Sequence, residues 1–164
     1  MRPALSRTLL LLAVAAAPAH VLAGQPSPPG KKSGGGQTVD AQVRALIDTA
    51  ATAKSQDDQQ AAFDRVLSLG CAAVPGLGAA LDDGRRLPVR YIRLENHAQD
   101  RFEAFRQYGP ETVTDAVAAL LNQLTGEHFG SIYNGATPEE RAKTVKAWRN
   151  FIARTPPGQL CKGA

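Results

Sequence analysis

Hydrophobic residues recur at helical spacing from Thr38 onward, which predicts a helical domain. The first stripe is formed by Val39, Val43, Leu46, Ile47 and Ala50. A second stripe, formed by Phe63, Val66 and Leu67, follows a Ser55–Asp58 pair that has the spacing of a capping box. Gly70 is placed to end this second helix in the left-handed conformation.

The middle of the chain is less regular. A short third helix is predicted over Val74–Leu81, with Pro75 in its first turn, where a missing N–H costs nothing. Residues 87–94 alternate weakly and contain Pro88, which favours an extended excursion. Residues 101–108 are predicted to form another short helix.

The last two helices have the clearest signals. One is predicted to begin at Pro110, with Glu111 and Asp115 in its first turn, and to end at Gly126. The other begins at Thr137, whose spacing to Glu140 is again that of a capping box, and ends before Pro156–Pro157. Their stripes are Val113, Val117, Leu120, Leu121 and Leu124, then Ala142, Val145, Trp148 and Ile152. We therefore expect an all-α, irregular helical-hairpin domain of five or six helices at residues 38–155, with a tail at 156–164.

The N-terminal residues 1–23 have the pattern of a signal peptide. Arg2 and Arg7 precede an apolar run at residues 9–17, and small residues continue to Ala23. We expect cleavage after Ala23, with residues 17–19 as a second possible site, and a periplasmic or secreted product. No apolar run approaches the 18 residues of a membrane span, so the mature protein is not expected to cross a membrane.

Residues 24–37 combine five glycines, three prolines and two serines, and contain no large apolar side chain. Such a segment cannot offset the entropy lost on ordering, so it is predicted to be a flexible linker.

Charge argues against a nucleic-acid partner. The chain carries a formal charge of +4, and without Arg2 and Arg7 the remaining 17 basic and 15 acidic residues leave +2. Nucleic-acid binding proteins normally show a concentrated basic face. No cofactor motif is present either, and no cofactor is expected.

Cys71 and Cys161 are the two cysteines of the chain. An exported protein permits a disulfide between them, which would join the end of the second helix to the tail. The alternatives are one buried and one loose thiol, or a reactive or metal-binding pair.

An arginine-rich segment with interleaved aromatic residues is the leading candidate for a binding surface. Arginine and aromatic side chains are enriched at binding hot spots. The alternative is structural, with the arginines paired to nearby acids and the aromatics packed inward. The candidate binding residues are Arg85, Arg86, Arg90, Tyr91, Arg93, Arg101 and Phe105.

A second candidate is the acidic cluster around His97. Glu95, His97 and Asp100 offer carboxylate and imidazole groups for acid–base or metal chemistry, although such runs are more often solvated turns. No catalytic motif occurs, so no catalytic or metal-ligating residue is assigned. His128, beside Phe129, is expected in a loop anchored by that ring, and Trp148 is expected in the core.

Two stretches resemble bacterial exported HEAT-like helical-repeat proteins. At residues 72–83 the sequence Val-Pro-Gly-Leu, with Leu-Asp following it, is similar to the second helix of such a repeat. At residues 118–148 the motif Leu-Thr-Gly-x-x-Phe-Gly, with the distant Trp148, resembles the C-terminal part of such proteins. The resemblance implies a helical-hairpin scaffold that binds other molecules, although no regular repeat is present here.

The expected function is therefore non-enzymatic binding of a protein or acidic polymer. Two alternatives remain open. One is a small envelope hydrolase or metal-dependent enzyme using Glu95, His97 and Asp100. The other is an inhibitor or immunity-type protein, which would share every feature of the binding module.

Overall fold

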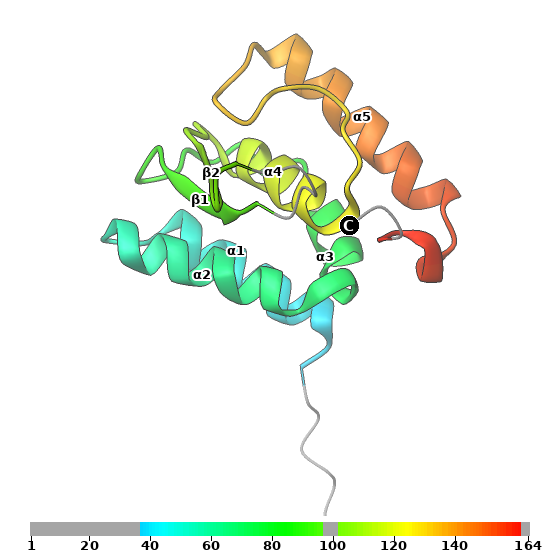
Figure 1. Ribbon diagram of the computed structural model, residues 1–164, viewed down its shortest axis with the longest axis horizontal. Coiled ribbons are helices and arrows are strands. Elements are labelled where there is room, and N and C mark those ends of the chain that lie inside the picture. Colours follow the sequence, from blue (N-terminus) through cyan, green and yellow to red (C-terminus); the bar gives the residue numbers. More distant parts are fainter. Residues whose placement is uncertain (1–36, 97–101, 162–164) are drawn as a thin grey trace, which may run out of the picture. The chain divides into compact units, whose positions relative to one another are not determined.

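Five α-helices and one β-hairpin are present in the computed structural model, which describes residues 37–96 and 102–161 (Figure 1). The predicted signal peptide and all of the linker except Gln37 lie outside these residues. The elements are α1 (Val39–Ala51), α2 (Gln56–Ser68), α3 (Val74–Ala79), β1 (Ile92–Glu95), β2 (Phe105–Tyr108), α4 (Val113–Thr125) and α5 (Pro138–Arg154). Two short 3-10 turns add Gly70–Ala73 and Pro157–Gln159.

Side-chain caps define where the helices begin. The Ser55 hydroxyl accepts a hydrogen bond from the Asp58 N–H at 3.1 Å, and the Glu140 carboxylate accepts one from the Thr137 N–H at 2.8 Å. Both caps were predicted. Helix α4 begins later than predicted, at Val113 rather than Pro110, because Thr112 and Asp115 form a reciprocal capping box.

Helix α4 is the centre of the core. It packs against α2, α3 and α5, and every side chain from Val113 to Leu121 is buried. The sequence predicted one apolar stripe, but Ala116, Ala118 and Ala119 let neighbours approach on the other sides. A helix whose side chains are buried on all sides belongs in the interior of the domain.

The main correction concerns residues 101–108, which were predicted to be helical. Phe105–Tyr108 instead form β2, which pairs antiparallel with β1 from Ile92 opposite Tyr108 to Glu95 opposite Phe105. Strand β1 fits the predicted extended excursion, with Ile92 and Leu94 buried. The fold is mostly helical, with this hairpin as its one sheet in the described residues.

The C-terminal tail returns to the core. Helix α5 ends before Pro156–Pro157, and the following turn brings Leu160 into the interior at 4% exposure. Cys161 is bonded to Cys71, with an Sγ–Sγ distance of 2.11 Å and a Cα–Cα distance of 5.9 Å. The predicted tail therefore belongs to the folded domain as far as Cys161.

Trp148 lies in the core, as expected, and is fully buried. Its ring packs edge-on against Phe129, with 4.7 Å between ring centroids, and against Phe151 at 6.0 Å. Phe129 is thus the anchor of the loop that follows α4.

Replacing both cysteines, Cys71→Ser with Cys161→Ser, should lower the free energy of unfolding by about 2–5 kcal/mol, because the unfolded chain loses a constraint between residues 90 apart. Urea unfolding of the two proteins under oxidising conditions measures the difference. A reductant should lower the stability of the native chain by a similar amount and leave the double variant unchanged. Equal stability of the two proteins without reductant would contradict the prediction.

Candidate functional site

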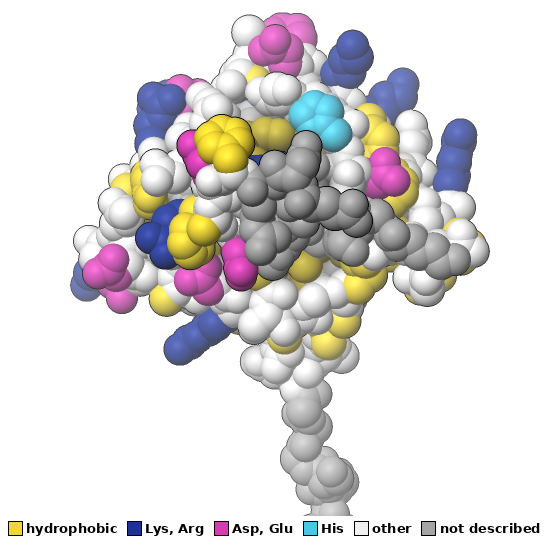
Figure 2. Space-filling model, in the orientation of Figure 1, with side chains coloured by type: hydrophobic (Ala, Val, Ile, Leu, Met, Phe, Trp, Pro, Cys, Tyr) yellow, Lys and Arg dark blue, Asp and Glu magenta, His cyan; other side chains and the backbone are white. Residues whose placement is uncertain are grey.

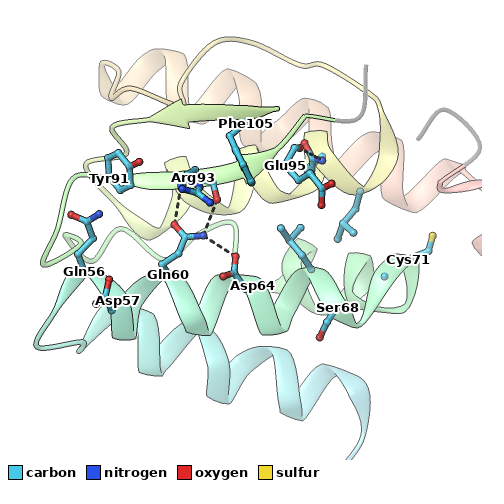
Figure 3. Close-up of a pocket in the computed structure, with 14 residues that line it drawn as sticks. Gln56, Asp57, Gln60, Asp64, Ser68, Cys71, Tyr91, Arg93, Glu95 and Phe105 are labelled. Atoms are coloured by element: carbon cyan, nitrogen blue, oxygen red, sulfur yellow. Dashed lines mark hydrogen bonds between the residues drawn. The ribbon is translucent and has the colours of Figure 1, made fainter. Parts of the chain in front are cut away.

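A half-open groove of about 760 Å³ runs between α2 and the β-hairpin (Figure 3). Side chains of α2 form one wall, and side chains of β1 and β2 form the other. The lining residues are Gln56, Asp57, Gln60, Asp64, Leu67, Ser68, Gly70, Cys71, Tyr91, Arg93, Glu95, Phe105, Gln123 and Leu124. Both walls combine polar with apolar groups.

Three of the predicted binding residues meet on the hairpin wall of this groove. Tyr91, Arg93 and Phe105 all line it, although Phe105 comes from the other strand. The Arg93 guanidinium carbon lies 3.8 Å from the centroid of the Phe105 ring, a cation–π arrangement. An arginine and an aromatic ring of the predicted surface are therefore stacked on each other.

The other predicted arginines are placed differently. Arg85 pairs with Asp83 and, at 2.7 Å, with Asp48 of α1. Arg90 pairs with Glu111 at 2.9 Å. These two arginines form ion pairs of the kind expected in the alternative interpretation, and both side chains stay about half exposed. Arg86 forms a backbone bridge with Thr112, and Arg101 lies outside the described residues.

The Arg85 pair affects the titration of its partner. Hydrogen bonds from the Arg85 guanidinium hold the pKa of Asp83 below its usual value, against a smaller opposing effect of burial. The second pair, between Arg85 and Asp48, connects the segment between α3 and β1 to α1.

The outer edge of β1 is closed by side-chain amides. Gln59 accepts from the Val89 N–H at 3.1 Å and donates to the carbonyls of Val89 and Tyr91 at 2.8 and 3.1 Å. Gln60 accepts from the N–H of Arg93 and donates to its carbonyl, both at 2.8 Å. The two glutamines of α2 thus supply the bonds that a neighbouring strand would supply.

Helix α4 adds a third amide to this edge. Gln123 donates to the Glu95 carbonyl at 2.6 Å. The hairpin wall of the groove is therefore fixed to both α2 and α4 through backbone atoms, which holds Arg93 and its neighbours in place.

Aromatic groups face outward on the hairpin. Phe102 is 95% exposed and Phe105 is 40% exposed. Figure 2 shows hydrophobic side chains beside a basic one on this face of the molecule. Aromatic side chains are among the residue types enriched at binding hot spots.

Behind the hairpin, Tyr108 of β2 packs edge-on against Tyr133, with 5.2 Å between ring centroids. The Tyr133 hydroxyl is hydrogen-bonded to Nδ1 of His128 at 3.0 Å. Burial, and to a smaller extent the neighbouring Tyr108, raises the pKa of Tyr133 to about 12. His128, placed by the sequence in a loop, thus also braces the tyrosine behind β2.

A network of ion pairs links the residues before β1 to α4 and α5. Asp115 is fully buried and pairs with Arg141 of α5 at 2.7 Å. Arg141 also pairs with Glu111 at 3.1 Å, and Glu111 in turn pairs with Arg90. Hydrogen bonds from Arg141 to Asp115 raise the pKa of Arg141 above its usual value. The network connects the excursion, α4 and α5.

The alternative cluster is described only in part. Glu95 lines the groove, whereas His97 and Asp100 lie outside the described residues. Within residues 37–96 and 102–161, no group of three His, Cys, Asp or Glu side chains is arranged to hold a metal ion.

Sequence reasoning missed the glutamines. Gln59 lies four residues before Phe63 and seven before Val66, so it shares the buried face of α2. A buried amide requires hydrogen-bond partners, and this position was the available signal that α2 packs on an exposed backbone edge.

Comparisons with known proteins found no matching family model, no matching curated protein and no matching solved structure. The resemblance to HEAT-like repeats therefore stays a prediction. None of the helices in the described ranges is both long and apolar enough to cross a membrane.

Gln59→Leu should lower the free energy of unfolding by about 1–3 kcal/mol, because backbone groups of Val89 and Tyr91 lose their partners. Denaturant unfolding measures the loss, and amide hydrogen exchange should become faster at Val89. Gln56→Leu, on the exposed start of the same helix, is the control and should change stability by less than about 0.5 kcal/mol. Equal effects of the two substitutions would show that the amide does not hold the edge.

Folding favours the neutral Tyr133 phenol, because its pKa rises from 10.0 to about 12 in the folded protein. The resulting stability is present below pH 10 and is lost as the pH rises from 10 to about 12. In Tyr133→Phe this loss should be shallower, as measured by unfolding at several alkaline pH values. A Tyr133→Phe profile as steep as the native one would refute the assignment.

Proposed function

We propose that this protein is an exported, non-enzymatic binding module that contacts its partner through the outer face of the β-hairpin. We define this hairpin face by Arg93, Phe102 and Phe105. The observation that carries the proposal is the exposure of Phe102 and Phe105 beside an arginine that is stacked on one of the two rings. Aromatic and arginine side chains dominate binding hot spots.

The contacts that fix the hairpin to the rest of the domain support the proposal. Gln59, Gln60 and Gln123 bind the backbone of the excursion and β1, and Tyr108 of β2 packs against the buried Tyr133. A contact surface that is held in place before binding loses less conformational entropy when the partner arrives. The hairpin face thus combines the residue types and the rigidity of a binding surface.

The groove supplies a second contact region beside the hairpin face. Arg93 and Phe105 belong to both, so a partner seated on the rings would also reach the polar side chains of α2. A volume of about 760 Å³ lies within the range of ligand pockets in proteins.

Export is part of the proposal. It rests on the signal-peptide pattern of residues 1–23, and the Cys71–Cys161 disulfide is compatible with an oxidising compartment such as the periplasm or the external medium.

The proposal predicts position-specific crosslinking. A photo-crosslinking amino acid at Phe102 should capture a defined partner from an envelope extract, and the same group at Lys146 on α5 should not. Phe105→Ala in the Phe102-labelled protein should reduce the adduct about tenfold, because a hot-spot side chain is removed.

The matched control is Phe151→Ala, which removes a half-buried ring from α5, away from the hairpin face. It should leave the adduct unchanged as long as the protein stays folded. Identical adducts from Phe102 and Lys146, or none from Phe102, would overturn the proposed function.

A further inference from the structure

The outer edge of β2 is open, in contrast to the outer edge of β1. The Asn96 N–H donates to the Ala104 carbonyl at 2.9 Å, so the alternation of antiparallel pairing turns the backbone groups of residues 104, 106 and 108 toward β1. The N–H and C=O groups of Phe105 and Gln107 therefore point away from the hairpin. Neither residue has a backbone hydrogen-bond partner at that edge in the described part of the chain.

The next outward group confirms this direction. The Gly109 N–H donates to the Asn134 side chain at 2.7 Å. The open stretch is thus bounded at Gly109 and spans Phe105 and Gln107, both of which are exposed. A row of unpaired strand groups is a template for pairing with another extended chain.

The charged side chains around the outer edge of β2 indicate which kind of extended segment could pair there. Arg93 crosses from β1 onto the Phe105 ring of β2, and Arg106 lies on the opposite face of the sheet. Neither arginine forms an ion pair with a carboxylate of residues 37–96 or 102–161. A strand added to β2 would have an arginine near each of its faces.

The carboxylates of the groove do not offset this charge at the open edge. Asp57 and Asp64 belong to α2, which lies beyond the other edge of β1. Glu95 and Glu103 are the acidic residues of the described hairpin. Glu95 shares β1 and its outward face with Arg93, but the Arg93 guanidinium reaches over the Phe105 ring of β2, toward the open edge, and Glu103 precedes β2.

We propose that the outer edge of β2 binds an extended acidic segment of a partner protein as a third strand. Backbone hydrogen bonds to Phe105 and Gln107 provide the pairing, and Arg93 and Arg106 select acidic side chains. This inference rests on the proposed function and specifies the partner of the same hairpin.

The test uses the mature chain and a capped, labelled peptide of repeated valine-glutamate-glutamate, which places glutamates on both faces of a strand, with repeated valine-lysine-lysine as the charge control. Fluorescence anisotropy should show saturable binding of the glutamate peptide and none of the lysine peptide. Gln107→Pro removes the outward N–H without touching the bonds to β1, and should weaken binding about tenfold or more. Gln107→Ala keeps that N–H and should bind like the native chain.

Amide hydrogen exchange on the native chain gives a second readout that needs no variant. The glutamate peptide should slow exchange at Phe105 and Gln107, and leave exchange unchanged at Arg106, whose N–H already faces β1. Unchanged binding by folded Gln107→Pro, equal binding of the lysine peptide, or protection at α2 instead would overturn the inference. So would self-association of the chain through this edge without peptide binding.

The two proposals fail separately. Capture at Phe102 together with unprotected Phe105 and Gln107 amides would leave the binding module standing and reject strand addition. No capture at Phe102 and no protection at β2 would reject both.

Discussion

The capping of β1 by glutamine side chains is the interaction on which the arrangement of this domain depends. A two-stranded hairpin is marginally stable alone in water, because it buries little apolar surface without a helix or a further strand packed on it. Here Gln60 and Gln123 satisfy one side of β1 from two different helices, and Gln59 does the same for the residues just before it. The hairpin is thereby attached to both α2 and α4. The groove exists because α2 contacts the edge of β1 through long amide side chains, which keep the helix and the strand apart.

The helices follow from local signals, and for that reason the sequence predicts them well. The Ser55 and Thr137 caps, the left-handed Gly126 and the Pro156 stop each act within a few residues. Strand β2 could not be found in this way. Its four residues carry no strong pattern of their own, and their conformation is decided by pairing with residues of β1 that lie 10 to 16 positions earlier in the chain. The start of α4 was misplaced by three residues for a different reason: both Pro110 and Thr112 are favourable helix starts, and the Thr112–Asp115 capping box decides between them.

The arginine-rich segment shows how much of a candidate site can be predicted from amino-acid composition. Arg85, Arg90 and Arg93 look alike in the sequence, yet the first two are engaged by Asp48 and Glu111, whereas Arg93 lies against an aromatic ring. Those acids come from α1 and from the turn before α4, so the division depends on tertiary packing. Composition therefore indicated a candidate segment, and only the fold could separate the arginines that pair with acids from Arg93, which lies against a ring.

The disulfide divides the domain into a covalent ring and a cover. Cys71 and Cys161 enclose the hairpin, α4 and α5 in one closed loop of chain, while α1 and α2 lie before it. The cover carries Gln59 and Gln60, and it joins the ring by a single peptide connection and by non-covalent packing. A partial opening that lifts α2 away would leave the ring intact and bare the second edge of β1. If α2 opened in this way, the outer edge of β1 at Arg93 would be exposed while the Cys71–Cys161 disulfide is still closed.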